Sequence, residues 1–133
     1  MTIITRIIVT GLVAGFISGI ADFIFSIISI FGIFFPIVLT VDIQMLAIYT
    51  IITASLWGIV WVLLYAFFYD YIPGKGVRRG LFFGLIIWII APTSNWIISA
   101  ACGYYLLAIQ TVIVTFFSIG IVYGLILGYI YKE

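Results

Sequence analysis

The chain has 133 residues and a formal net charge of +1; 67% of its residues are hydrophobic and only 7% are charged. A soluble domain carries about 25% charged residues, so this chain has too few charges to build a surface that water would solvate. The charge balance also excludes nucleic-acid binding, which needs clustered basic residues on one face. We therefore expect an integral membrane protein whose main partner is the lipid bilayer.

Residues able to hold a metal or a cofactor are scarce. The chain has no histidine and one cysteine, Cys102, so the usual ligands of haem, copper and catalytic zinc are missing. The four acids, Asp22, Asp42, Asp70 and Glu133, lie far apart in the sequence. We expect no metal site, no cofactor and no catalytic group, and hence a protein that is not an enzyme.

The N-terminal half contains two apolar runs longer than the roughly 20 residues that cross a hydrocarbon core. We expect the first transmembrane helix over 7–30 and the second over 43–69. Between them, residues 31–41 contain the helix breakers Gly32 and Pro36. This segment is predicted to lie at the outer membrane interface.

The C-terminal half is long enough for two more spans. A Pro73-Gly74 turn precedes it, and residues 81–131 carry no charge at all. The apolar pattern is weakest near Cys102-Gly103, so the third span is predicted over 77–101 and the fourth over 106–131. The expected fold class is an all-α bundle of four transmembrane helices forming a single domain.

Positive charges fall at three places: the N-terminus, the loop between the second and third spans, and the C-terminus. The residues are Arg6, Lys75, Arg78, Arg79 and Lys132. A four-span layout puts all three places on one side of the membrane. Since basic loops stay in the cytoplasm, we expect a protein of the cell membrane with both termini and the basic loop in the cytoplasm.

Glycines four residues apart share one helix face and let two helices approach closely in lipid. Three such ladders occur, in the first, third and fourth spans: Gly11, Gly15 and Gly19; Gly76, Gly80 and Gly84; Gly120, Gly124 and Gly128. The first and last ladders lie at similar depth, which predicts that they pack against each other in the cytoplasmic half. The alternative is that glycine is simply frequent in membrane helices.

The second span carries an aromatic ridge, because Trp57, Trp61, Tyr65 and Tyr69 recur every four residues on one face. Such a ridge is a candidate partner face for another membrane protein chain. It could equally fill a glycine groove within the bundle or face lipid and the headgroups.

Asp22 is the one charge inside a predicted span, about 15 residues into the first helix and on its glycine face. A carboxylate inside the membrane is costly and marks a functional site by default. Polar residues at similar depth include Thr53, Thr115 and Ser118. The candidate buried polar site comprises Asp22, Ser18, Ser55, Ser94 and Asn95.

Two hypotheses follow for this site. Asp22 either binds a cation or carries a proton, or it is a neutral, hydrogen-bonded group that holds helices together. Pro92 breaks the third span next to Ser94 and Asn95, and interrupted helices form ion sites in transporters. The two hypotheses stay open at this point.

The central region resembles uncharacterised four-span membrane proteins of bacteria and archaea. The resemblance rests on LWGIV (56–60), YIPG (71–74) and RGLFFGL (79–85) with Trp88, about the middle third of the chain. It implies a four-span fold and carries over no activity or site.

Two functions remain. We favour a structural or accessory subunit of a larger membrane complex, because the short loops leave little outside the bilayer. The alternative is a small oligomeric transporter or channel for a cation or proton that uses Asp22. Either function implies other membrane chains as partners, in a hetero-complex or a homo-oligomer.

Overall fold

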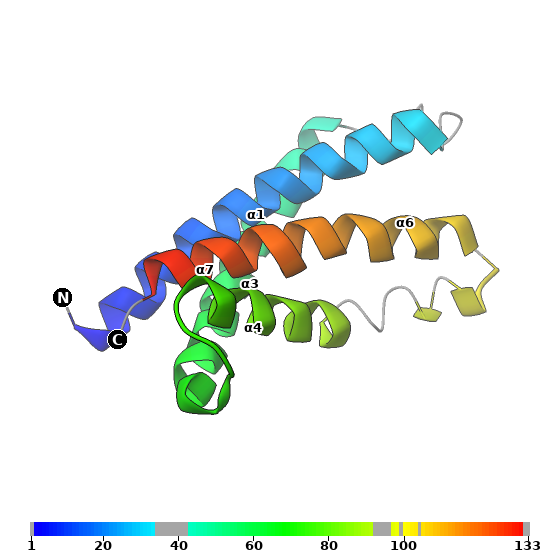
Figure 1. Cartoon of the computed structure of the whole chain (residues 1–133). Helices are drawn as coiled ribbons and strands as arrows, with labels where there is room; N and C mark the ends of the chain where they lie inside the picture. Colours follow the sequence, from blue (N-terminus) through cyan, green and yellow to red (C-terminus); the bar gives the residue numbers. More distant parts are fainter. Residues whose placement is uncertain (1, 34–42, 92–96, 99, 104, 132–133) are drawn as a thin grey trace.

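The computed structural model describes residues 2–33, 43–91, 97–98, 100–103 and 105–131. Within these ranges all the regular structure is helical and no strand occurs, which confirms the all-α fold class (Figure 1). Three stretches are long and apolar enough to cross a membrane: Ile3–Ile27, Ala47–Tyr71 and Ala108–Ile130. They correspond to the first, second and fourth predicted spans.

The described helices occur in the following order along the chain. The elements are α1 (Ile3–Ile33), α3 (Ile43–Phe68), the 3-10 turn η1 (Tyr69–Tyr71), α4 (Val77–Ile90), α6 (Tyr105–Thr115), the π-helical segment η2 (Phe116–Tyr123) and α7 (Gly124–Ile130). The last three are continuous and form one rod, called the C-terminal helix below.

The structure agrees in part with the predicted third span and with the predicted outer segment. The helix predicted over 77–101 ends at Ile90 as α4, just before Pro92, whose ring is incompatible with a regular helix interior. At the other junction, α1 continues through Gly32 to Ile33. The remainder of the segment 31–41 lies outside the described residues, as do residues 92–96.

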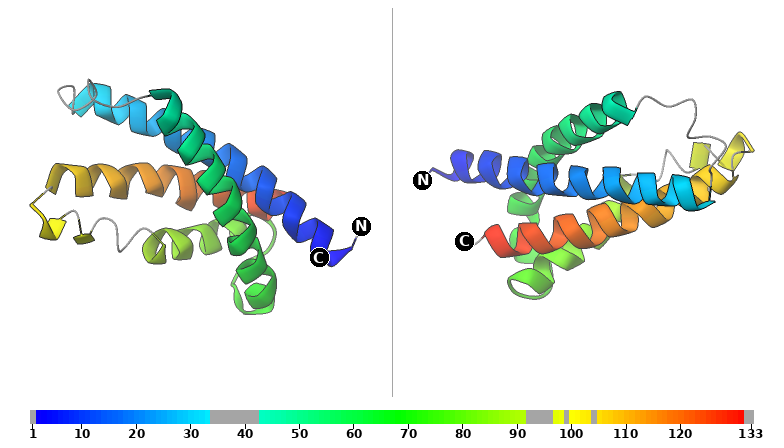
Figure 2. Two further views of the ribbon diagram at one scale, coloured as in Figure 1. Left: turned by 180° about the vertical axis from the view of Figure 1, so that it is seen from behind. Right: turned by 90° about the horizontal axis from the view of Figure 1, so that it is seen from above.

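Two close helix crossings organise the bundle. α3 crosses α1 obliquely, while α4 runs alongside the C-terminal half of the C-terminal helix (Figure 2). At the first crossing, a Cβ added to Gly11 would lie 2.5 Å from the Ile59 Cα. At the second, a Cβ added to Gly84 would lie 2.7 Å from the Gly120 carbonyl oxygen. Only glycine permits backbones this close.

The predicted pairing of the first and last glycine ladders is wrong. α1 does contact η2, but Gly11, Gly15 and Gly19 face α3, around Gly58 and Ala54. The other described ladders face each other: Gly80 and Gly84 meet Gly120, Gly124 and Gly128. Periodicity marks which face of a helix is small, and it does not say which helix that face meets.

Gly76, predicted as the first rung of the third ladder, is a turn glycine. It has φ +54 and precedes α4, and a Cβ added to it would meet nothing within 4 Å. Gly74, two residues earlier, has φ +96. These left-handed conformations favour glycine and turn the chain from η1 into α4.

Aromatic side chains fill the core where α3, α4 and the C-terminal helix meet. Tyr65 and Tyr123 are fully buried. The ring of Tyr65 contacts those of Phe83 and Tyr131 at centroid distances of 5.0 and 5.4 Å. Edge-to-face pairs of this kind add to the packing energy.

The aromatic ridge of the second span therefore points partly inward. Trp61 is 8% exposed and Tyr65 is 0% exposed, so these two residues cannot offer a partner face. Trp57 is 53% exposed, and Tyr69 is half-buried. Of the alternatives proposed for the aromatic ridge, packing within the bundle is correct for its two central residues, Trp61 and Tyr65.

Both termini lie at one end of the molecule, close to the 70–76 loop (Figure 1). Two cation–π contacts link them: the Arg6 guanidinium lies 5.3 Å from the Tyr131 ring centroid, and that of Arg79 lies 4.1 Å from the Tyr69 ring. The Tyr69 and Tyr131 rings are 5.8 Å apart. The basic residues described at the N-terminus and in the loop thus gather at one end of the bundle.

Candidate functional site

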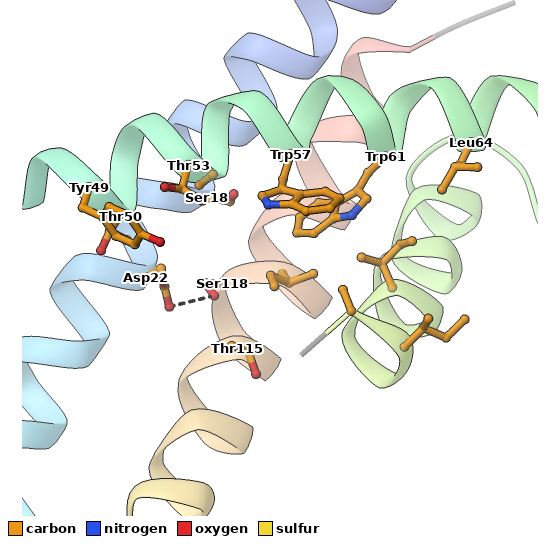
Figure 3. Close-up of a pocket in the computed structure, with 15 residues that line it drawn as sticks. Ser18, Asp22, Tyr49, Thr50, Thr53, Trp57, Trp61, Leu64, Thr115 and Ser118 are labelled. Carbon is orange, nitrogen blue, oxygen red and sulfur yellow. Dashed lines mark hydrogen bonds between the residues drawn. The ribbon is translucent and has the colours of Figure 1, made fainter. Parts of the chain in front are cut away.

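A cavity of about 600 Å³ lies between the helices, with residues of α1, α3, α4 and the C-terminal helix in its walls (Figure 3). Its polar lining is contributed by Ser18 and Asp22 of α1, Tyr49, Thr50 and Thr53 of α3, and Thr115 and Ser118 of the C-terminal helix. Protein sites that hold small molecules have volumes of about 300–1,000 Å³, so this cavity has the size of a ligand site.

Asp22 and Ser118 point toward each other across the cavity (Figure 3). The Ser118 hydroxyl donates a hydrogen bond of 3.4 Å to Asp22 Oδ1. This is longer than the roughly 2.5–3.0 Å of a strong O–H···O bond, and it is the one hydrogen bond that the Asp22 carboxyl group receives from a described residue. The carboxyl group therefore retains most of its capacity to accept.

Ser118 lies within η2, where the backbone is π-helical. Single π-helical turns within α-helices are rare and often occur at functional sites. Gly120 and Gly124 pack on α4, while Ser118 faces α1. The segment thus presents a hydroxyl to Asp22 on one side and a close backbone contact on the other.

The other predicted site residues divide into two groups. Ser18 is 2% exposed and lines the cavity beside Asp22, whereas the Ser55 hydroxyl donates to the Ile51 carbonyl at 2.8 Å on its own helix and is not part of the lining. Ser94 and Asn95 lie outside the described residues. The predicted cluster is thus brought together only as far as Asp22 and Ser18.

Sequence reasoning did not place Thr50 or Tyr49 at the site. They belong to the first turns of α3, and the oblique crossing of α3 over α1 brings them level with Asp22 (Figure 3). The sequence did place Thr115 and Ser118 at the depth of Asp22, on the face of their helix away from its glycines. It did not indicate which helix that face meets.

The other described residues of the lining are aromatic or aliphatic. The indoles of Trp57 and Trp61 stack at a centroid distance of 6.3 Å and an interplanar angle of 28°. Leu64 lies beyond them, away from the polar side chains (Figure 3). Ile87 and Ile90 of α4 complete the apolar walls. The cavity has a polar end at Asp22 and an apolar end between α3 and α4.

No described basic side chain is near Asp22. Arg6 is on the same helix but 16 residues away, about 24 Å at 1.5 Å per residue. Lys75, Arg78 and Arg79 belong to the loop and the first turn of α4, at the basic end of the bundle. A positive charge for Asp22 would have to come from outside the described chain.

These features define a helical protein with three helices long and apolar enough to cross a membrane and a partly polar cavity between its helices. No protein-family model, no curated protein and no solved structure matches this chain. The function is therefore argued from the cavity itself.

Proposed function

We propose that this chain is a small transport protein of the cell membrane and that the cavity at Asp22 is its substrate site. The substrate carries positive charge, and Asp22 is the group that attracts it. The observation that carries the proposal is one carboxyl group, weakly hydrogen-bonded, in a cavity about 600 Å³ in volume between all the long helices.

The proposed topology has four membrane crossings, with both termini and the basic loop in the cytoplasm. The contacts of Arg6 with Tyr131 and of Arg79 with Tyr69 support it. They bring the N-terminal and loop charges to the same end of the bundle as the end of the C-terminal helix. A single basic side is the pattern that orients membrane proteins.

The protein is proposed to act as a homo-oligomer. Four helices in one chain leave little room for a path across the membrane. A second copy would supply further helices for this path, away from the Trp57 side of the cavity, where Trp57 is 53% exposed. An accessory subunit would have to contact its partner through other residues than Trp61 and Tyr65, which are buried inside this chain.

Charge movement in proteoliposomes tests the proposal. Purified protein is reconstituted, and the current that follows a jump in sodium, potassium or tetramethylammonium concentration is recorded on a supported membrane. We expect an electrogenic signal that Asp22→Asn abolishes and that Asp70→Asn retains, since Asp70 is exposed outside the cavity. Co-purification with a different chain at fixed ratio, and no signal from the isolated protein, would instead favour the accessory role.

A further inference from the structure

We propose that the ligand of this cavity is a lipophilic organic cation with a bulky apolar body and a single positive charge, entering from the hydrocarbon of the membrane. This inference rests on the proposed function and narrows its substrate class. Four observations carry it: the volume of the cavity, its chemical asymmetry, the single acidic residue among its described lining residues, and its exposed rim.

The volume is too large for a bare inorganic ion. A cavity of about 600 Å³ compares with about 30 Å³ for one water molecule in the liquid. A metal ion at Asp22 would therefore leave most of the space to water between apolar walls. A ligand of some tens of heavy atoms fills it, and drug-sized ligands occupy sites of this size.

The two ends of the cavity differ in chemistry. Asp22, Thr50 and Ser118 lie at one end, and Leu64 and the α4 side chains lie at the other (Figure 3). Between them stand the stacked indoles of Trp57 and Trp61. Indole faces attract cations and bury flat apolar groups, so a ligand with charge at one end and aromatic surface at the other matches the lining.

Three hydroxyl groups at the polar end donate their protons to other groups of the protein. The Ser18 hydroxyl donates to the Gly15 carbonyl at 3.1 Å, and the Ser118 hydroxyl donates to Asp22. The Thr115 hydroxyl donates to Thr111 of its own helix. Because a hydroxyl has one proton and two lone pairs, these three groups retain acceptor oxygens. Together with the Asp22 carboxyl group, these oxygens favour a cation over an anion.

The number of charges follows from the acids present. Among the described side chains that line the cavity, Asp22 is the one acidic residue, and no described basic residue pairs with it. One carboxylate neutralises one positive charge. A divalent ligand would leave an uncompensated charge in a medium of low dielectric constant, which is strongly unfavourable.

The route of entry follows from the rim. Trp57, Tyr49 and Ile90 line the cavity and are 53%, 71% and 67% exposed. They belong to α3 and α4, which diverge at this level (Figure 2). In a membrane these exposed apolar and aromatic groups face lipid, so the cavity opens sideways into the bilayer.

Two ions of equal shape and opposite charge test the inference. The full chain is placed in nanodiscs of phosphatidylcholine, and binding of radiolabelled tetraphenylphosphonium is measured against empty nanodiscs. We expect saturable binding that tetraphenylborate does not displace. Asp22→Asn should weaken it by about 30-fold or more, while Asp22→Glu and the distant Asp70→Asn should retain it.

The aromatic wall is tested separately at its exposed residue. Trp57→Leu should lower affinity by about 2- to 5-fold, whereas Trp57→Phe should lower it less. These variants and the anion competition keep the inference testable if Asp22→Asn fails to fold.

The outcomes separate the two proposals. Equal binding of both ions, or binding unchanged in Asp22→Asn, overturns the ligand class. If tetramethylammonium drives an Asp22-dependent current but tetraphenylphosphonium does not bind, the ligand class is wrong and the transport proposal stands. If tetraphenylphosphonium binds through Asp22 but a jump in its own concentration drives no Asp22-dependent current, and the smaller cations drive none either, the ligand class stands and transport is wrong. Failure of both assays overturns both.

Discussion

Gly58 lies where three helices meet. A Cβ added to it would clash with the Gly11 carbonyl oxygen and would lie 2.8 Å from the Gly15 Cα. Its own carbonyl accepts a hydrogen bond of 2.8 Å from the Tyr123 hydroxyl. The sequence could not single it out as a packing residue, because it is a lone glycine outside any ladder. Gly58 is a packing residue because α1 and the C-terminal helix both contact α3 at this position.

The Tyr123 hydroxyl offers a conservative test of this meeting point. Tyr123→Phe removes the bond to Gly58 and keeps the ring contact with Trp61, whose centroid is 5.2 Å away. We expect the free energy of unfolding to fall by about 0.5–1.5 kcal/mol, measured by denaturant titration in detergent. Tyr71→Phe is the matched control, since Tyr71 is 84% exposed, and it should change stability by less. Equal effects would contradict the role of the bond.

At the scale of elements, sequence predicted the helices better than their faces. The second span was expected over 43–69 and is observed as Ile43–Phe68. The aromatic ridge on the same helix was left open between lipid, partner and core. In a soluble protein the polar face identifies the solvent side. In lipid both sides are apolar, so periodicity identifies a face without saying where it points.

The candidate site shows the same difference between what the sequence predicts within one helix and what depends on how the helices pack. Asp22 was predicted because a charge inside a span is costly wherever it lies, and Ser18 because it lies on the same helix face as Asp22. Thr50 and Tyr49 were missed, because their position depends on the angle at which α3 crosses α1. A crossing angle is set by which glycines meet which backbone, and that information is not local in the sequence.

Two glycines of facing helices should respond oppositely to the same substitution. A Cβ at Gly80 would clash with the backbone of Gly124 and Gly128, so Gly80→Ala should destabilise the protein by about 1–3 kcal/mol. A Cβ at Gly120 would meet the Leu85 side chain at 3.4 Å, an ordinary contact. Gly120→Ala should leave stability unchanged or raise it by up to about 1 kcal/mol.

Thermal unfolding of both variants in the same detergent provides the comparison. If the two alanine variants lowered the unfolding temperature equally, the distinction drawn from the backbone contacts would be wrong.

For the whole molecule, the proposed orientation can be checked with the chain's single cysteine. Cys102 is exposed, and the 100–103 segment lies at the opposite end of the bundle from both termini (Figure 1). In intact cells a membrane-impermeant thiol reagent should label Cys102 from outside. In a Cys102→Ala background, Lys75→Cys should be labelled only after the membrane is opened. Labelling of both positions from one side would contradict the four-crossing layout.

A side opening toward lipid changes what sets the rate of binding. A compound that reaches Asp22 between α3 and α4 is drawn from molecules already dissolved in the bilayer, so its association rate follows its partition coefficient multiplied by its aqueous concentration. Association rate constants of analogues that differ only in partitioning should therefore disagree when expressed per litre of buffer. They should converge when expressed per mole fraction of ligand in the lipid.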